Sequence, residues 1–111
     1  MSKKTEVILV VTTCKSRAEA RQIVTSLVEK RLAACGNIVE PTVTSIYGWK
    51  GRIERAKEVL VILKSTRKAF LALEKEVTRL HSYEVPEIIA LPIVAGSRKY
   101  LSWVDKSVGK K

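Results

Sequence analysis

A length of 111 residues suits a single domain, which we place at residues 1–111, and a hydrophobic content of 46% excludes a wholly disordered chain. The formal charge of +10 permits attraction to polyanions, but the basic residues are spread along the chain, which argues against a specific nucleic-acid interface. No apolar run approaches the roughly 20 residues of a membrane-spanning helix, so we expect no membrane partner.

The first predicted elements are a strand and a helix. Residues 7–11 form a continuous apolar run, which is typical of a strand covered on both faces. Ser16 and Glu19 have the spacing of a capping box, which marks a helix start. Apolar residues then recur at helical spacing, and we expect this helix to reach Lys30 or Arg31.

Residues 35–64 predict a long hairpin of two strands. The turn falls at residues 48–51, whose sequence is Gly-Trp-Lys-Gly, and the return arm carries the apolar run 59–63. Pro41 has no backbone N–H to donate, so we expect it to mark a bend or bulge in the outgoing arm.

The rest of the chain predicts a second helix, a last strand and a short third helix. Apolar spacing places the second helix at about 67–80, and residues 88–94 are typical of a strand with Pro92 at an unpaired edge. The third helix starts near Ser97, and we expect the tail at 109–111 to fray. This order of elements predicts an α+β, ferredoxin-like βαββαβ antiparallel sheet, with helices on one face and a short C-terminal helix.

Two features of this fold predict self-association. Residues 7–11 and 59–63 are apolar at successive positions, yet the helices can cover only one face of the sheet. Hairpin arms of about a dozen residues extend roughly 40 Å, whereas a domain of this size is roughly 34 Å across. The hairpin therefore overhangs its own domain, and a closed ring of copies would bury both surfaces.

Five segments of the chain, in register, are similar to the divalent-cation tolerance (CutA) family. They are Val-Thr-Thr-Cys at 11–14, Arg-Leu-Ala-Ala-Cys at 31–35, Tyr-Gly-Trp-Lys-Gly at 47–51, the stretch from His81 to Pro92, and Gly96 with Tyr-Leu-Ser-Trp at 100–103. The resemblance covers about residues 6–105 and implies a ferredoxin-like fold with a link to copper and divalent-cation tolerance. It also implies a homotrimer built through sheet edges and the hairpin, similar to that of the PII nitrogen-signalling proteins. Lys15 and Gly36 depart from the family pattern, which often has proline and a small apolar residue there.

Three residues are candidate ligands for copper(II) or another divalent cation. His81 is the only histidine, and its alternative role is to cap the end of the second helix. The resemblance adds that a histidine at this motif position is among the family's proposed copper ligands. Cys14 ends the first strand before a helix N-terminus, where a lowered pKa would favour a thiolate, and its alternative role is packing. Cys35 opens the second strand, and its alternative role is that of a buried core thiol.

A second group of residues predicts a cleft. Tyr47, Trp49, Tyr83 and Glu84 offer an aromatic wall with one carboxylate, which suits a small-ligand site between subunits. The alternative for these residues is packing inside the trimer, with Trp49 as an interface anchor. The turn at 48–51 is too short for the extended ligand loop of PII proteins.

The sequence favours a binding protein over an enzyme. It has no His-Glu-x-x-His, Gly-x-Ser-x-Gly or glycine-rich phosphate pattern. With the resemblance, we expect a homotrimer that binds copper or other divalent cations and has no organic cofactor. The alternatives are a metal-free scaffold or PII-like small-ligand sensor, and non-specific polyanion binding through net charge. Two cysteines form no disulfide framework and no secretory pattern is evident, so we expect a cytoplasmic location.

Overall fold

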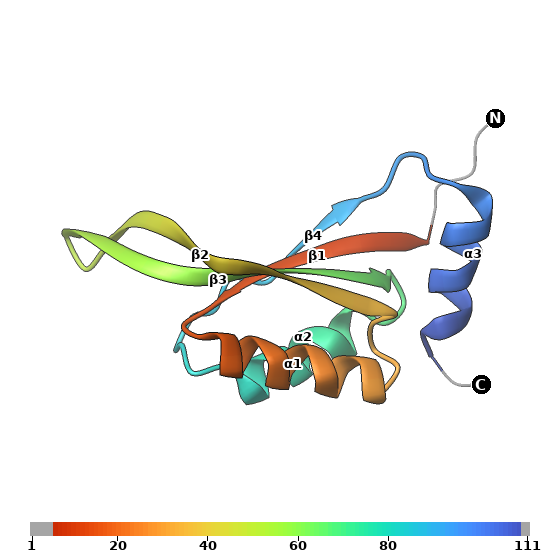
Figure 1. The fold of residues 1–111 in the computed structure, drawn as a ribbon, viewed down its shortest axis with the longest axis horizontal. Coiled ribbons are helices and arrows are strands. Elements are labelled where there is room, and N and C mark those ends of the chain that lie inside the picture. Colours follow the sequence, from red (N-terminus) through yellow and green to blue (C-terminus); the bar gives the residue numbers. More distant parts are fainter. Residues whose placement is uncertain (1–5, 110–111) are drawn as a thin grey trace.

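The computed structural model describes residues 6–109 and shows one antiparallel sheet with three helices (Figure 1). The elements, in chain order, are β1 (Val7–Cys14), α1 (Arg17–Glu29), β2 (Cys35–Trp49), β3 (Arg52–Thr66), α2 (Phe70–Leu80), β4 (Ile89–Pro92) and α3 (Arg98–Ser107). The strands lie in the order β2-β3-β1-β4, and each neighbouring pair is antiparallel. The predicted α+β, ferredoxin-like fold is therefore confirmed.

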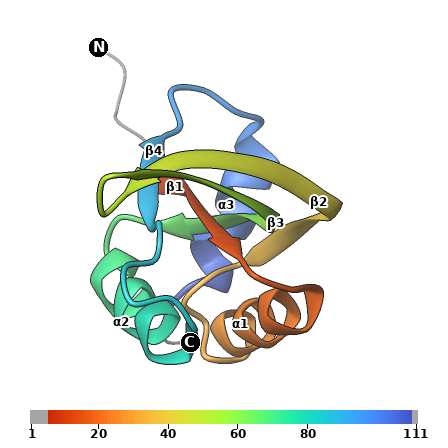
Figure 2. The ribbon, with the colours of Figure 1, turned by 90° about the vertical axis from the view of Figure 1, so that its left-hand side faces the viewer.

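The core lies between the sheet and the two longer helices. Helices α1 and α2 lie side by side on one face of the sheet (Figure 2), while α3 lies at one end of it (Figure 1). Alternate residues of a strand face the same side, and in β1 these are Ile8 and Val10, both buried. They pack in one cluster with Ile23 of α1 and Leu73 and Val77 of α2, as the helical spacing predicts.

Several element boundaries differ from the sequence prediction because tertiary contacts set them. Helix α2 begins at Phe70 rather than at residue 67, since residues 67–69 form a turn in which the Thr66 hydroxyl accepts the Ala69 N–H. Strand β4 is limited to Ile89–Pro92 because it pairs only with residues 8–11 of β1. It lies at the edge of the sheet, which is the position expected for a strand that contains Pro92.

The hairpin turn is also tighter than predicted. Trp49 pairs with Arg52, so Lys50 and Gly51 alone form the loop, with φ angles of 52° and 77°. Positive φ at both central residues is typical of a type I′ turn, which matches the twist of its strands. The expected fraying does not extend to Gly109, whose N–H donates to the Arg31 carbonyl at 2.8 Å. Lys110 and Lys111 lie outside the described residues.

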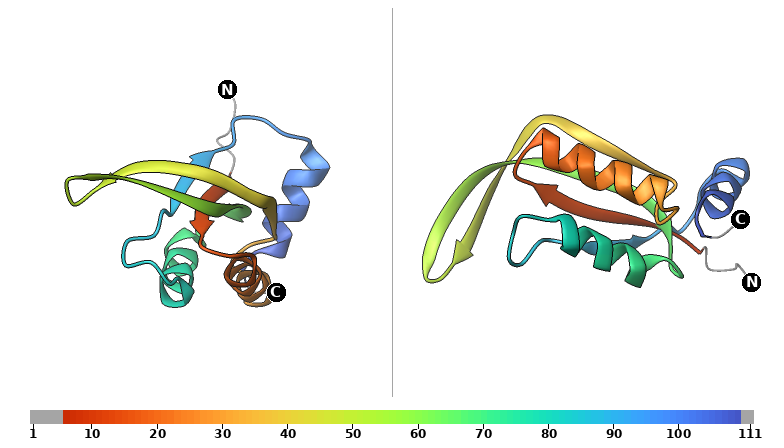
Figure 3. Two further views of the ribbon diagram at one scale, coloured as in Figure 1. Left: turned by 60° about the vertical axis from the view of Figure 1, so that its left-hand side comes forward. Right: turned by 90° about the horizontal axis from the view of Figure 1, so that it is seen from below.

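The β2–β3 hairpin projects beyond the helices, as the strand lengths predict (Figure 3). The described residues measure 46 × 31 × 24 Å along their principal axes, and the hairpin gives the longest dimension (Figure 1). The pairing of β2 with β3 shifts register between Val39 and Val43, which places a bulge around Pro41 as predicted. Past this bulge the hairpin leaves the covered part of the sheet.

The face of the sheet opposite α1 and α2 is apolar and largely uncovered. Leu9 pairs with Leu91 and Val11 with Ile89, so these four side chains share that face. Ile89 is 50% exposed and Leu91 42% exposed. Helix α3 covers only one end of the sheet, where Val104 packs with Val7 and Ala34. None of the helices within residues 6–109 is long and apolar enough to cross a membrane.

Candidate functional site

His81 follows α2 directly, and its ring turns into the protein interior. Its backbone N–H closes the last turn of α2 on the Val77 carbonyl at 2.8 Å. The ring Nε2 lies 2.8 Å from the Thr13 carbonyl oxygen, and the Tyr83 N–H donates to Nδ1 at 3.1 Å. A carbonyl only accepts and a backbone N–H only donates, so these bonds fix a neutral ring with its proton on Nε2. His81 is thus the C-cap residue of α2 through its backbone, while its ring connects β1 to the loop after α2.

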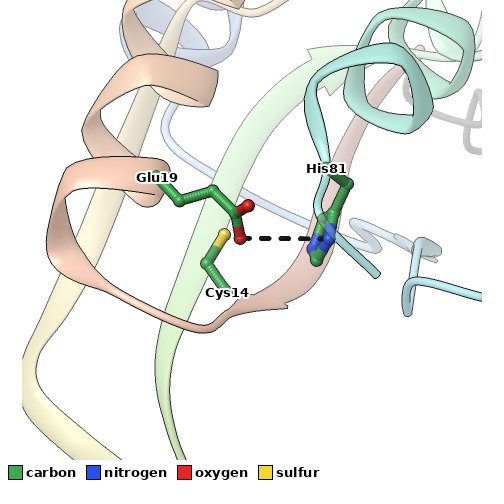
Figure 4. A group of neighbouring side chains, drawn as sticks. All are labelled: Cys14, Glu19 and His81. Atoms are coloured by element: carbon green, nitrogen blue, oxygen red, sulfur yellow. Dashed lines mark ion pairs between the residues drawn. The ribbon is translucent and has the colours of Figure 1, made fainter. Parts of the chain in front are cut away.

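Glu19 lies beside His81 in the first turn of α1. The Ser16 hydroxyl accepts the Glu19 N–H at 3.2 Å, which is the predicted N-cap. The carboxylate does not return this bond to Ser16 and accepts instead from the N–H groups of Lys15 at 3.3 Å and Ser82 at 2.9 Å. Its Oε1 lies 4.0 Å from His81 Nδ1 (Figure 4). Glu19 thus connects α1 to the loop after α2.

Cys14 completes this group of buried donors. Its Sγ, a carboxylate oxygen of Glu19 and a ring nitrogen of His81 all lie within 4.8 Å of one another (Figure 4). Burial raises the pKa of the Cys14 thiol to about 12, and the negative charges of Glu19 and Glu58 act in the same direction. The expectation of a lowered pKa is therefore wrong, because desolvation outweighs the nearby helix N-terminus. The group holds a thiol, a carboxylate and a neutral imidazole.

Cys35 is not part of this group. Cys14 pairs with Val59 and Cys35 with Lys64, so the two cysteines are separated by about 17 Å along β3. The Cys35 thiol instead lies 3.7 Å from the Tyr100 hydroxyl of α3 and is partly exposed. The structure therefore brings together two of the three predicted ligands and adds Glu19.

The four residues predicted for a cleft do line one cleft, within a single chain. Tyr47 and Trp49 come from the hairpin and Tyr83 and Glu84 from the loop after α2, and together they border a volume of about 790 Å³. Glu58 of β3 also lines it, and its Oε2 accepts the Tyr83 hydroxyl at 2.6 Å. Burial, followed by the bond to Glu58 and its negative charge, raises the pKa of Tyr83 well above its ordinary value.

The cleft and the donor group share a wall. Thr13, which accepts the His81 ring N–H, lines the cleft, and so does Ser82, which donates to Glu19. The rings of His81 and Tyr83 are 4.8 Å apart between centroids. The donor group thus holds the loop segment 81–84 in place, and that segment presents Tyr83 and Glu84 to the cleft.

The sequence does not predict two side chains of the candidate site, Glu19 and Glu58. Glu19 is assigned there only to a helix cap, because nothing local reveals that its carboxylate faces a histidine from another element. Glu58 precedes the apolar run 59–63, and a buried carboxylate at that point has no sequence pattern of its own. The one feature of the sequence that could have indicated Glu58 is a charged residue directly before the apolar run 59–63 of β3.

Comparisons with known proteins agree on one family. The family model described as "CutA1 divalent ion tolerance protein" matches residues 8–107. The Divalent-cation tolerance protein CutA of Thermus thermophilus is 49% identical over 94% of this chain and 98% of its own length. Human Protein CutA is 48% identical over 83% of this chain, which spans only 51% of the human protein.

Solved structures give the same result. The divalent cation tolerance protein (Cut A1) from Thermus thermophilus superimposes with a TM-score of 0.90, at 48% identity, over 93% of this chain and 99% of that one. CutA from Xylella fastidiosa superimposes with a TM-score of 0.91, at 32% identity, over 95% of this chain and 100% of that one. On sequence and on fold, the chain belongs to the CutA1 divalent ion tolerance protein family.

Proposed function

We propose that the protein binds a divalent transition-metal ion at Cys14, Glu19 and His81, within an assembly of three copies. The observation that carries this proposal is the gathering of a sulfur, an oxygen and a nitrogen donor within 4.8 Å of one another, from three separate elements. The names of the relatives, which refer to divalent-cation tolerance, support the same class of ion.

The donor set fits copper(II) or zinc better than magnesium or calcium. Thiolate and imidazole are preferred by the softer metals, whereas magnesium and calcium take oxygen donors. Among divalent first-row ions, copper has the highest affinity for a given mixed site. A bound ion would supply positive charge to a buried group whose only charge is that of the Glu19 carboxylate.

The existing hydrogen bonds make this binding weak. His81 Nδ1 already accepts the Tyr83 N–H, and both oxygens of Glu19 accept backbone N–H groups. The Cys14 thiol must also lose its proton before sulfur can serve as a strong ligand. An ion therefore has to displace a proton and at least one backbone donor.

The uncovered apolar face supports assembly. Leu9, Val11, Ile89 and Leu91 share a face that α1 and α2 do not reach, and contiguous apolar surface of this kind marks an interaction site. A second copy brings a matching surface, and the family resemblance favours three copies in a closed ring. Light scattering tests this point, because a folded single chain at micromolar concentration would exclude the ring.

Calorimetric titration of metal-free protein with copper(II), zinc and magnesium tests the metal site. We expect saturable copper binding that weakens by about tenfold or more in Cys14→Ser and His81→Ala, and is unchanged in Cys35→Ser. Because His81→Ala also removes the support of loop 81–84, Cys14→Ser is the cleaner variant. Equal copper affinity in wild type and Cys14→Ser would exclude Cys14, and equal affinity in all variants would exclude the site.

The cleft supports a second candidate function, the binding of a small organic ligand. Its specific support is that Tyr47, Trp49, Tyr83 and Glu84 line one volume of about 790 Å³, within the range of small-molecule sites. Thermal-shift screening of metal-free protein separates the two functions. Stabilisation by organic compounds without metal would favour the cleft, and stabilisation by copper alone would favour the donor group.

We also propose that the protein works by binding, without catalysis, in the cytoplasm. The free thiols of Cys14 and Cys35 suit a reducing compartment. The names of some relatives specify other places, chloroplastic in Arabidopsis thaliana and periplasmic in Archaeoglobus fulgidus, so fractionation of the native cells is the direct test.

A further inference from the structure

The cleft has a charge opposite to that of the chain. The protein carries a formal charge of +10, yet the charged residues lining the cleft are the carboxylates of Glu58, Glu84 and Glu87. Of the described residues that border it, none is a lysine, an arginine or a histidine. A negative recess in a basic protein selects positively charged ligands by electrostatic focusing.

Of the three carboxylates, the buried Glu58 would be stabilised most by a bound cation. The residue is only 6% exposed, and the hydrogen bond that it accepts from Tyr83 at 2.6 Å comes from a neutral hydroxyl. Within residues 6–109, none of Glu58, Glu84 and Glu87 forms an ion pair. A buried carboxylate without a counter-charge is costly, and a bound cation would offset that cost.

The arrangement does not suit a bare metal ion. A metal ion needs several ligand atoms that point to one place. Within residues 6–109, the group of this kind is Cys14, Glu19 and His81. Glu58, Glu84 and Glu87 line the cleft of about 790 Å³ and are not part of that group. A cleft of this volume, lined by three carboxylates, suits an organic molecule that carries more than one positive charge.

The aromatic residues add a second attraction for the same class of ligand. Tyr47, Trp49 and Tyr83 line the cleft, and the faces of such rings attract ammonium and guanidinium groups. The Nζ of Lys50 already lies 5.9 Å from the centroid of the Trp49 ring. A ligand cation at the Trp49 ring would therefore compete with this ammonium group of the same chain.

We propose that the cleft binds an extended organic cation, of the polyamine or guanidino-amine class, with Glu58, Glu84 and Glu87 as counter-charges and the three aromatic rings as walls. This inference rests on the second candidate function, the use of the cleft as a small-ligand site. It requires no ion at Cys14 or His81, so metal-free protein tests it separately from the metal site.

Intrinsic fluorescence of the full-length, metal-free protein tests the proposal. Trp49 borders the cleft and Trp103 lies on α3, so a Trp103→Phe background leaves Trp49 as the single indole. The probes are agmatine, a linear compound with a guanidinium and an ammonium group, adipate as an anion of similar length, and hexanediol as a neutral one. We expect saturable quenching or shift with agmatine alone, weakening as salt is added.

Matched variants test which carboxylates contribute to agmatine binding. Glu84→Gln combined with Glu87→Gln removes two rim carboxylates, and we expect agmatine to bind about tenfold more weakly. Glu58→Gln keeps an acceptor for the Tyr83 hydroxyl and removes the buried charge, so it should weaken binding as well. Glu74→Gln, an exposed residue of α2 outside the cleft, should leave the affinity unchanged.

The other outcomes overturn the inference in distinguishable ways. Binding of adipate or hexanediol but not agmatine would keep the cleft as a ligand site and refute its preference for cations. Binding of none of the three compounds would refute both. If agmatine does not bind to wild type and the Glu84→Gln, Glu87→Gln variant changes its assembly mass, the inference is refuted. These carboxylates would then form ion pairs with basic side chains of a second copy.

Discussion

The ring of His81 donates its Nε2–H to the carbonyl oxygen of Thr13 across 2.8 Å, and so ties the end of α2 to the end of β1. The opposite ring nitrogen accepts the Tyr83 N–H. One imidazole therefore fixes both the donor group and the wall of the cleft. A metal ion that took Nδ1 from the Tyr83 N–H would therefore also disturb the segment that presents Tyr83 and Glu84 to the cleft.

The first prediction concerns the tautomer of this ring. Because both partners have fixed roles, His81 should carry a proton on Nε2 and none on Nδ1 in metal-free protein. Long-range proton–nitrogen NMR spectra distinguish the two nitrogens, and the single histidine makes the assignment unambiguous. A proton found on Nδ1 would contradict the described hydrogen bonds.

The second prediction concerns thiol reactivity. Burial raises the pKa of Cys14 to about 12, so its thiol should resist Ellman's reagent at pH 8 until the protein unfolds. The measurement uses a Cys35→Ser variant, in which Cys14 is the remaining cysteine. Denatured protein gives the full thiol count as a control. Rapid reaction of the folded variant would show that Cys14 is neither buried nor raised in pKa.

The same pKa shift predicts a loss of stability at alkaline pH. Between the ordinary thiol pKa of 9.0 and the folded value of about 12, the unfolded chain loses a proton that the folded protein keeps. The free energy of unfolding therefore falls as pH rises through this window. Denaturant unfolding at pH 8 and pH 10 should show a smaller fall in Cys14→Ala than in wild type, since other titrating groups are common to both. Equal falls would remove Cys14 as the cause.

Local patterns predict the elements, whereas the site depends on tertiary contacts. The apolar run at 7–11 and the Ser16 cap belong to neighbouring residues, and they correctly locate β1 and the start of α1. The sequence identifies Cys14 and His81 as candidate ligands separately, and no local pattern indicates that Glu19 lies close to both. The sequence predicts the pKa of Cys14 in the wrong direction because desolvation depends on what packs over a thiol, and sequence spacing does not report this.

The third prediction concerns the contact between α1 and α2 at Glu76. The carboxylate accepts from Arg79 at 2.7 and 3.0 Å, from Ser26 at 2.6 Å and from Lys30 at 2.9 Å. The bond from Arg79, followed by those from Ser26 and Lys30, holds the pKa of Glu76 well below its ordinary 4.5. Glu76→Gln should therefore lower the free energy of unfolding by about 1–2 kcal/mol at pH 7.

The pH dependence of this effect follows from the lowered pKa. The unfolded chain takes up a proton as pH falls below 4.5, while the folded protein keeps Glu76 ionised. The advantage of wild type over Glu76→Gln should thus be full at pH 7 and shrink as pH falls below 4.5. Glu74→Gln, on the exposed side of α2, serves as the control and should change little at either pH. A constant difference between pH 7 and pH 3 would contradict the role of the charge.

The fourth prediction tests the open face of the sheet. Leu91 pairs with Leu9 on that face and is 42% exposed in the single chain, so Leu91→Glu would place a charge in any contact between copies. We expect light scattering to show a fall from the proposed three-copy mass to that of one chain. Val94→Glu is the matched control, because Val94 is 93% exposed and lies beyond β4. An assembly that survives Leu91→Glu and dissociates in Val94→Glu would place the interface elsewhere.

The fifth prediction concerns Gly36 of β2. A Cβ at this position would lie 2.7 Å from Val24 Cγ1 and 2.8 Å from Leu63 Cδ2, both closer than side chains normally approach. Gly36→Ala should therefore destabilise the fold by about 1–3 kcal/mol, measured by denaturant unfolding. Gly48→Ala is the control, since only the Arg52 carbonyl lies near its added Cβ, at 3.9 Å. Combining Gly36→Ala with Val24→Ala removes one of the two clashes, so the double variant should be more stable than the sum of the single effects predicts. Strict additivity would show that the backbone moves to accept the methyl group, and that the size of Val24 does not exclude alanine at position 36.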